Sequence, residues 1–193
     1  MKKRNVVRVI LALVVIGLVV GVYYYFTVQK RASVEDAVEL TEVQKVITKD
    51  LDANYPATPR EVVKYYNRIV KCFYNETYTE DELYELGDQA RKLFDEELLE
   101  NNPRESYFDA LKADIEDYHE RSKTIRSSSV CDSNDVEFQT VDGRECAYVE
   151  ASYFTNENKD YSRTYQMYVL RKDDEGKWKI LVFYKVEGDP SDE

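Results

Sequence analysis

The stretch DDEGKWKILVFYKVE, Asp173 to Glu187, decides how the C-terminal half of the chain folds. It opens with Asp173-Asp174-Glu175-Gly176, a combination of residues that favours a tight turn. Behind the turn, apolar residues alternate with lysines, which is the period of two typical of a half-buried β-strand. The stretch therefore predicts a hairpin turn that leads into the last strand of an antiparallel sheet.

The same alternation runs through the preceding residues. Residues 147–154 alternate between apolar and more polar side chains, and residues 161–169 do so again after a polar turn at Asn156–Asp160. Two alternating runs joined by a short turn predict a β-hairpin. The chain after about Ser122 is therefore expected to form antiparallel strands.

Three amphipathic helices are expected before these strands. TPRE at Thr58–Glu61 and TEDE at Thr79–Glu82 each predict a capping box, and Asn101-Asn102-Pro103 separates a third helix from the second. Apolar residues at helical spacing form one stripe on each helix. The stripes are Val62, Tyr66, Ile69, Val70 and Phe73, then Leu83, Leu86, Ala90, Leu93, Phe94 and Leu98, then Tyr107, Phe108, Leu111, Ile115 and Tyr118.

Helices followed by antiparallel strands predict an α+β domain in which three helices pack on one face of a curved sheet. This order, with the closing DDEGKWKILVFYKVE, resembles the nuclear-transport-factor-2-like superfamily over about Thr58 to Glu187. The resemblance implies a bent sheet that curls around a helix to make a cone. More narrowly, the chain resembles small membrane-anchored Gram-positive bacterial proteins without an assigned function. The superfamily includes isomerases and dehydratases, but none of their pocket acids or bases has a matching motif here.

The N-terminal segment is strongly apolar. Residues 9–29 carry no charge and would span roughly 31 Å as a helix, the thickness of a bilayer core. A cleaved signal peptide would have a shorter apolar core and a small-residue cleavage site. Here the run ends in Tyr23-Tyr24-Tyr25-Phe26, which is typical of a membrane interface. We therefore expect residues 9–29 to be a transmembrane helix that contacts the lipid bilayer.

Basic residues before the apolar segment set the expected orientation. Lys2, Lys3, Arg4 and Arg8 favour a cytoplasmic N-terminus and an extracytoplasmic C-terminal domain at the cell membrane. Gly17 and Gly21 have the G-x-x-x-G spacing of spans that associate, which suggests a homodimer. The expected plan is a basic N-terminus at 1–8, a transmembrane helix at 9–29, a juxtamembrane stem at 30–57, the α+β domain at 58–187 and a disordered tail at 188–193.

The part of the chain after Arg31 is acidic. All 38 Asp and Glu but only 21 of the 27 Lys and Arg lie there, so its formal charge is −17. Binding to nucleic acid requires clustered basic residues, so no nucleic-acid partner is expected. The acidity itself is typical of a soluble extracytoplasmic domain.

Few residues suggest chemistry. His119, the single histidine, follows Asp114, Glu116 and Asp117, and it is either an acid/base group or a cation at a helix C-terminus. The stretch from Asp132 fails as a calcium loop, because Val136 and Glu137 occupy the fifth and sixth positions. No zinc, nucleophile-elbow or phosphate-loop motif is present, so no metal or cofactor is expected.

Seventeen tyrosines are many for this length. Tyrosine in strands often serves as a half-buried core residue. Alternatively, several tyrosines line the interior of the cone and form an aromatic pocket with hydroxyl groups. The pocket candidates are Tyr66, Tyr118, Tyr148, Tyr165 and Tyr184.

Cys131 and Cys146 can form a disulfide only in one of two strand registers. If Val136–Val141 is a strand that turns back at Asp142-Gly143, Gln139 pairs with Cys146 and the two sulfurs lie more than ~10 Å apart.

In the other register, Ser122–Cys131 pairs directly with Arg144–Thr155, and the two cysteines lie opposite one another. A disulfide is chemically allowed outside the cytoplasm and would contribute roughly 3 kcal/mol. We favour this second register. Cys72, on the first helix, is expected to be a buried thiol.

Two functions fit these observations. The first is a non-catalytic module at the cell envelope that binds a protein or a small apolar ligand. The second is an enzyme that uses His119 or an internal carboxylate as a base and tyrosine hydroxyls to polarise a carbonyl group. The side chains that point into the cone would discriminate between the two.

Overall fold

The computed structural model describes Val22 and residues 40–187. The chain divides between Leu40 and Thr41, and the fold below is that of the unit that begins at Thr41. The predicted α+β class is confirmed, since within residues 40–187 five α-helices precede an open antiparallel sheet of five strands. None of the described helices has both the length and the apolarity needed to cross a membrane. Residues 188–193, assigned to a tail, and all of the expected membrane span at 9–29 except Val22 lie outside the described residues.

Helices α3 (Pro59–Asn75) and α4 (Glu80–Arg91) begin at the predicted capping boxes. The hydroxyl of Thr58 accepts the N–H of Glu61 at 3.2 Å, and the Glu61 carboxylate accepts the N–H of Thr58 at 3.2 Å. Thr79 and Glu82 make the same reciprocal pair. Each box satisfies two N–H groups that a helix start leaves without a partner, so both starts are fixed by local sequence.

The packed domain includes helix α2 (Glu42–Ile47), so it begins earlier in the chain than the expected residue 58. The sequence suggests a stem over residues 30–57, but the part of this segment that includes α2 belongs to the hydrophobic core, where Val43, Val46 and Leu51 are buried. The side chain of Gln89 donates to the carbonyls of Ile47 and Lys49 at 2.8 Å each. These bonds attach the end of α2 to α4.

The predicted second helix is divided in two. Helix α4 ends at Arg91, and α5 (Glu96–Asn101) begins after a short link that starts as a turn at Lys92 and Leu93. Within this link Leu93 accepts the N–H of Ile180 at 2.8 Å, and Asp95 donates its N–H to the Ile180 carbonyl at 2.8 Å. Because both bonds go to the sheet, the continuous apolar stripe does not form one helix.

Helix α6 (Arg104–Glu120) is the predicted third helix. It approaches α4 closely at Gly87, where a Cβ atom would lie 2.3 Å from the Phe108 ring. A larger residue at this position would push the two helices apart.

The sheet contains β1 (Lys123–Val130), β2 (Glu137–Val141), β3 (Arg144–Glu157), β4 (Asp160–Lys172) and β5 (Trp178–Val186). Its order is β1-β3-β4-β5, and β2 also pairs with β3. Thus one edge of the long strand β3 is shared by two strands, with β2 beside its first half and β1 beside its second half. The turns predicted at Asn156–Asp160 and Asp173–Gly176 join β3 to β4 and β4 to β5.

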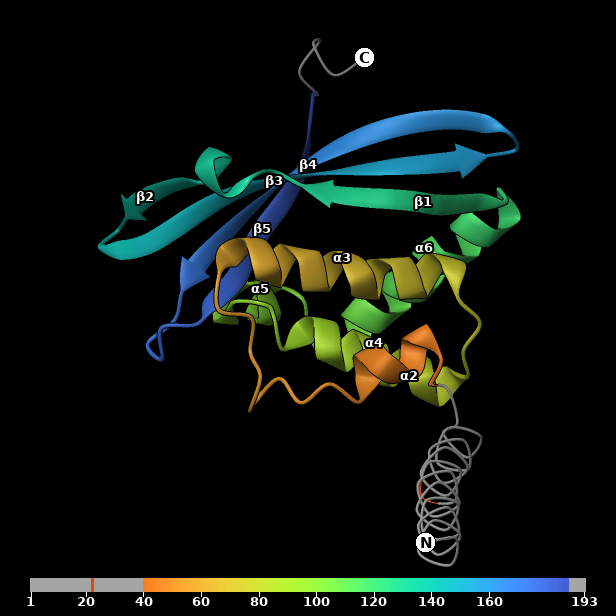
Figure 1. Cartoon of the computed structure of the whole chain (residues 1–193), viewed down its shortest axis with the longest axis horizontal. Helices are drawn as coiled ribbons and strands as arrows, with labels where there is room; N and C mark the ends of the chain where they lie inside the picture. The colour runs from red at the N-terminus through yellow and green to blue at the C-terminus, as the bar shows by residue number, and fades with distance from the viewer. Residues whose placement is uncertain (1–21, 23–39, 188–193) are drawn as a thin grey trace, which may run out of the picture. The chain divides into compact units, whose positions relative to one another are not determined.

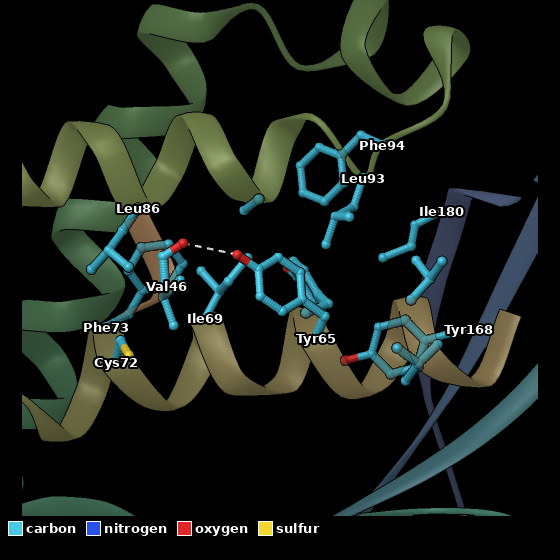
Figure 2. Close-up of a cluster of buried hydrophobic side chains, with 14 of the residues drawn as sticks. Val46, Tyr65, Ile69, Cys72, Phe73, Leu86, Leu93, Phe94, Tyr168 and Ile180 are labelled. Atoms are coloured by element: carbon cyan, nitrogen blue, oxygen red, sulfur yellow. Dashed lines mark hydrogen bonds between the residues drawn. The ribbon is translucent and has the colours of Figure 1, made fainter. Parts of the chain in front are cut away.

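All five helices lie on one face of the sheet (Figure 1), and α3 is the central one. Helix α3 contacts the sheet on one side and the helices α2 and α4 on the other. Figure 2 shows Tyr65, Ile69, Cys72 and Phe73 of α3 among buried side chains of α4 and of the sheet. The hydroxyl of Tyr65 donates to the Val46 carbonyl at 2.9 Å, which fixes α2 against α3.

A buried ion pair joins the link before α5 to strand β4. The side chain of Asp95 is only 3% exposed, and Arg171 binds it through Nε at 3.0 Å and through Nη2. Burial alone would raise the pKa of Asp95, but the hydrogen bonds from Arg171 and from the Glu97 N–H more than offset it and lower the pKa. The folded state therefore stabilises the charged carboxylate.

We expect Arg171→Ala to lower the free energy of unfolding at pH 7 by about 3–5 kcal/mol, because it leaves a buried carboxylate unpaired. A lowered pKa contributes stability above the ordinary aspartate value of about 3.9, and this contribution is lost as the pH falls through the folded-state pKa. The difference between wild type and variant should therefore shrink between about pH 5 and pH 3. Denaturant unfolding at several pH values measures it.

Arg163→Ala is the matched control, because Arg163 lies on the same strand and is exposed. It should change the free energy of unfolding by less than about 0.5 kcal/mol at every pH. An equal loss in both variants would show that the Asp95–Arg171 pair has no special role.

Candidate ligand-binding site

A cavity of about 410 Å³ lies between α3, α6 and the helix-facing side of the sheet. This volume falls within the range of small-molecule sites. Aromatic rings dominate its lining: Tyr66, Phe73, Tyr74, Tyr107, Tyr118, Tyr153, Tyr168 and Phe183. The lining residues that are also exposed to solvent, Ala110, Asp114 and Phe183, form what we call the rim.

Strand register places the sheet residues of this lining. Residues directly opposite one another on neighbouring strands share a face. Tyr168 lies opposite both Val149 and Phe183, and Tyr153 lies opposite Thr164. Because Val149 is fully buried under the helices, this row faces the cavity.

The pocket tyrosines expected from the sequence divide between the two faces of the sheet. Tyr66 and Tyr118, both on helices, line the cavity as expected. Tyr148, Tyr165 and Tyr184 do not line it, which corrects that expectation. Successive side chains along a strand point to opposite faces.

The register shows which face these three residues occupy. Tyr148 follows Ala147 and precedes Val149, both of which are buried in the core, and Tyr184 follows the cavity residue Phe183. Tyr165 lies between the cavity residues Thr164 and Gln166. All three therefore belong to the face that carries no helix within residues 40–187 (Figure 1).

A buried hydrogen-bond network forms the floor of the cavity. The hydroxyl of Tyr153 contacts Asn67 Oδ1 and lies 2.5 Å from the Tyr168 hydroxyl, which in turn lies 2.8 Å from Gln166 Oε1. Burial raises the pKa of both tyrosines above the ordinary value, so both hydroxyls stay protonated and neutral.

The proton count of this network indicates how Asn67 is oriented. Two hydroxyl protons serve three oxygen–oxygen contacts, whereas Asn67 Nδ2 is buried and has no partner among the described residues. Rotating the amide by 180° makes the NH₂ group a donor to Tyr153, and all three contacts then have a proton. We infer that Asn67 presents its NH₂ group to Tyr153.

The helix α6 presents a mixed stripe to the cavity. Tyr107, Ala110, Leu111, Asp114 and Tyr118 line it at the i, i+3, i+4, i+7 and i+11 positions of one helix face. Among the described residues, Asp114 is the one charged side chain in the lining. The rings of Tyr74 and Tyr118 stack with centroids 3.9 Å apart. Burial and then the charge of Asp114 raise the pKa of Tyr74.

Asp114 is a candidate ligand-binding residue that the sequence analysis names only as a neighbour of His119. Its position seven residues after Tyr107 and four before Tyr118 gives the helical spacing that would have found it. His119 does not line the cavity. It is exposed near the end of α6, beside a separate surface hollow that includes Thr77 and Lys123.

A second hollow of about 500 Å³ lies beside the link between α4 and α5. Charged side chains line much of it. Several of these charges already bind one another or the backbone. Lys177 pairs with Glu175 at 2.7 Å, and Lys179 donates to the Lys92 carbonyl at 2.7 Å. Among residues 40–187 no group of three or more His, Cys, Asp or Glu is arranged to hold a metal ion.

The structure contradicts the favoured disulfide register. Strand β2, Glu137–Val141, turns back and pairs with β3, and Gln139 lies opposite Cys146. The N–H of Cys131 instead donates to Glu150, four residues along β3 from Cys146. At about 3.3 Å per residue this separates the cysteines by roughly 13 Å, which is beyond disulfide reach. Cys72, Cys131 and Cys146 are all free thiols.

The helical layers, the open sheet and the aromatic cavity define an α+β domain of the helix-on-sheet class. The chain belongs to the family described as domain of unknown function DUF6715, whose family model matches residues 1–183. The match includes both the apolar N-terminal segment and nearly all of the domain. No curated protein matches the chain.

We expect no mass change when the purified chain is reduced, because the strand register keeps Cys131 and Cys146 apart. Brief treatment with iodoacetamide should modify Cys131, which is partly exposed, but not Cys72 or Cys146, which are 1% and 2% exposed. Burial also raises the pKa of Cys72 to about 11. All three thiols should react after denaturation, and mass spectrometry counts them. A gain in mass on reduction would contradict the register.

Proposed function

We propose that the protein is a non-catalytic binding module whose cavity between α3, α6 and the sheet holds a small, largely apolar ligand. The observation that carries the proposal is the aromatic lining, with hydrogen-bonding groups gathered at the floor. Apolar walls with a few placed polar groups are typical of small-molecule sites. Tyr66 supports this function, because its ring lies within 6 Å of Phe94, Tyr168 and Phe183 and extends the apolar wall.

An acid/base enzyme that uses the same cavity is the second candidate. Asp114 favours it, since a carboxylate beside tyrosine hydroxyls is the arrangement such a reaction requires. Two observations favour binding instead. Asp114 is exposed at the rim, where water solvates it, and His119 lies outside the cavity. General bases are commonly held in sites from which water is excluded, whereas Asp114 faces solvent.

The resemblance to the nuclear-transport-factor-2-like superfamily also stays a proposal. It is supported by helices that precede the strands, by their packing on one face of an antiparallel sheet, and by the cavity enclosed between them. In this interpretation α3 is the helix around which the sheet curls.

We further propose that residues 9–29 anchor the module in the cell membrane, with the N-terminus in the cytoplasm and the domain outside. The uncharged length of this segment and the preceding basic residues support it. An envelope protein or a second copy of the chain, associated through Gly17 and Gly21, is a further proposed partner.

If the anchor is correct, the full chain expressed in a bacterium should sediment with membranes and resist extraction at high pH. A chain that lacks residues 2–29 should remain in the soluble fraction. Protease added to intact spheroplasts should digest the domain of the full chain, whereas a cytoplasmic control protein stays intact. A protected domain would contradict the orientation, and a mature chain shortened at its N-terminus would indicate a signal peptide.

Photolabelling tests the cavity on the full chain in detergent micelles. Benzophenone, a neutral aromatic ketone, should attach to peptides of α3, α6 and β4 that line the cavity. Ala110→Trp should abolish this labelling, because the new indole occupies the rim. Ala113→Trp is the matched control on the same helix, since Ala113 is exposed and does not line the cavity. Mass spectrometry of the digested protein locates the adducts, and equal labelling of the two variants would refute the proposed site.

A further inference from the structure

We propose that the ligand of this cavity is an organic cation, an amine or quaternary ammonium group carried on an apolar body. This inference rests on the proposed binding function and specifies the ligand class. Two features carry it together. The charge of the cavity lining comes from one carboxylate, and the surrounding walls are aromatic.

The charge of the cavity lining favours a cation. Asp114 is negative, and no lysine, arginine or histidine of residues 40–187 lines the cavity. Within residues 40–187 no ion pair joins Asp114 to a basic side chain. The tyrosines that line the cavity are neutral hydroxyls. A bound monocation would therefore cancel the charge of the site, whereas a bound anion would face an unopposed carboxylate.

The aromatic walls of the cavity also favour a cation. The negative face of an aromatic ring attracts an ammonium group within about 6 Å of the ring centroid, and several rings together make a cage for quaternary ammonium. Eight aromatic side chains line this cavity, and one of them, Tyr118, lies four residues after Asp114 on α6 and stacks on Tyr74 of α3. The cavity thus combines π faces with a carboxylate, the two groups that recognise an organic cation.

One basic side chain, Lys123, lies next to an aromatic ring of the lining. The ammonium group of Lys123 lies 4.7 Å from the centroid of the Tyr118 ring. Lys123 does not line the cavity but borders the separate hollow beside His119. Because Tyr74 stacks on the Tyr118 ring and Lys123 lies over it, the faces of this ring are occupied, and the other aromatic rings of the lining are the ones open to a ligand. The cationic group of the ligand is accordingly assigned to the rim near Asp114, with its apolar body directed toward Tyr66 and Tyr168.

The charge of the whole chain acts in the same direction. A formal charge of −11 attracts cations to the surface and repels anions. This electrostatic field does not distinguish one cation from another, so it raises the local concentration of every cation. Selectivity has to come from Asp114 and the rings, and an experiment can separate the two contributions.

Isothermal titration of the full chain in uncharged detergent tests the inference with three soluble aromatic probes of similar size. These are benzyltrimethylammonium, neutral N,N-dimethylbenzamide and anionic phenylacetate. The cation should bind roughly tenfold more tightly than the neutral amide, and phenylacetate should bind least. Asp114→Asn should weaken binding of the cation about tenfold and change the affinity for the amide less than about twofold. Asp114→Glu should retain the preference for the cation.

Asp109→Asn is the matched control, because Asp109 is exposed on the same helix, lies outside the cavity lining and carries the same charge. It should leave all three affinities unchanged. Circular dichroism melts confirm that each variant is folded.

The outcomes separate the two proposals. If the amide or phenylacetate binds as tightly as the cation, or if Asp114→Asn binds the cation like wild type, the cation inference is overturned while the cavity function stands. An equal loss in Asp109→Asn would assign the effect to the general field and would also overturn it. If none of the probes binds and benzophenone does not label the cavity, the binding function itself fails.

Discussion

The fold depends on the burial of α3 on two sides. Its residues contact the sheet on one side and α2 and α4 on the other, so this helix has little surface left for water. A polar group on these buried sides costs free energy unless it has a partner within the protein. Tyr65 has one at the Val46 carbonyl, and one end of the Asn67 amide has one at Tyr153, while its other end has no partner among the described residues. These two contacts attach α2 to α3 and build the floor of the cavity.

Local signals predicted much of this architecture. The capping boxes at Thr58 and Thr79 placed two helix starts, and alternation placed the long hairpin of β3 and β4, because these signals act within a few residues. The break before Asp95 was missed because its cause is a pair of backbone bonds to Ile180, far away in sequence. The predicted register that placed Cys131 opposite Cys146 is wrong for the same reason. Two strands, β1 and β2, share one edge of β3, and no local signal indicates this.

The candidate site was harder to predict than the fold. Tyr66 and Tyr118 were found because helical periodicity placed them on inward-facing stripes. Placing the strand tyrosines requires knowing which alternate residues of each strand face the helices. The buried residues Val149 and Tyr153 identify that face, but only once the strand pairing is known. Asp114 was overlooked because a carboxylate on an amphipathic helix is ordinarily read as solvent-facing. Its neighbours at helical spacing, rather than its own type, show that it borders a cavity.

The link between α4 and α5 also affects when this domain can finish folding. The two backbone bonds that join the link to the sheet both go to Ile180, and the carboxylate of Asp95 pairs with Arg171. During synthesis the helical segments emerge well before these two residues. Until β4 and β5 are made, the link has no strand to join and Asp95 has no cation. The helices of a nascent chain thus wait for nearly the last residues of the domain, and a ribosome stalled before Ile180 would hold an incompletely assembled helical layer.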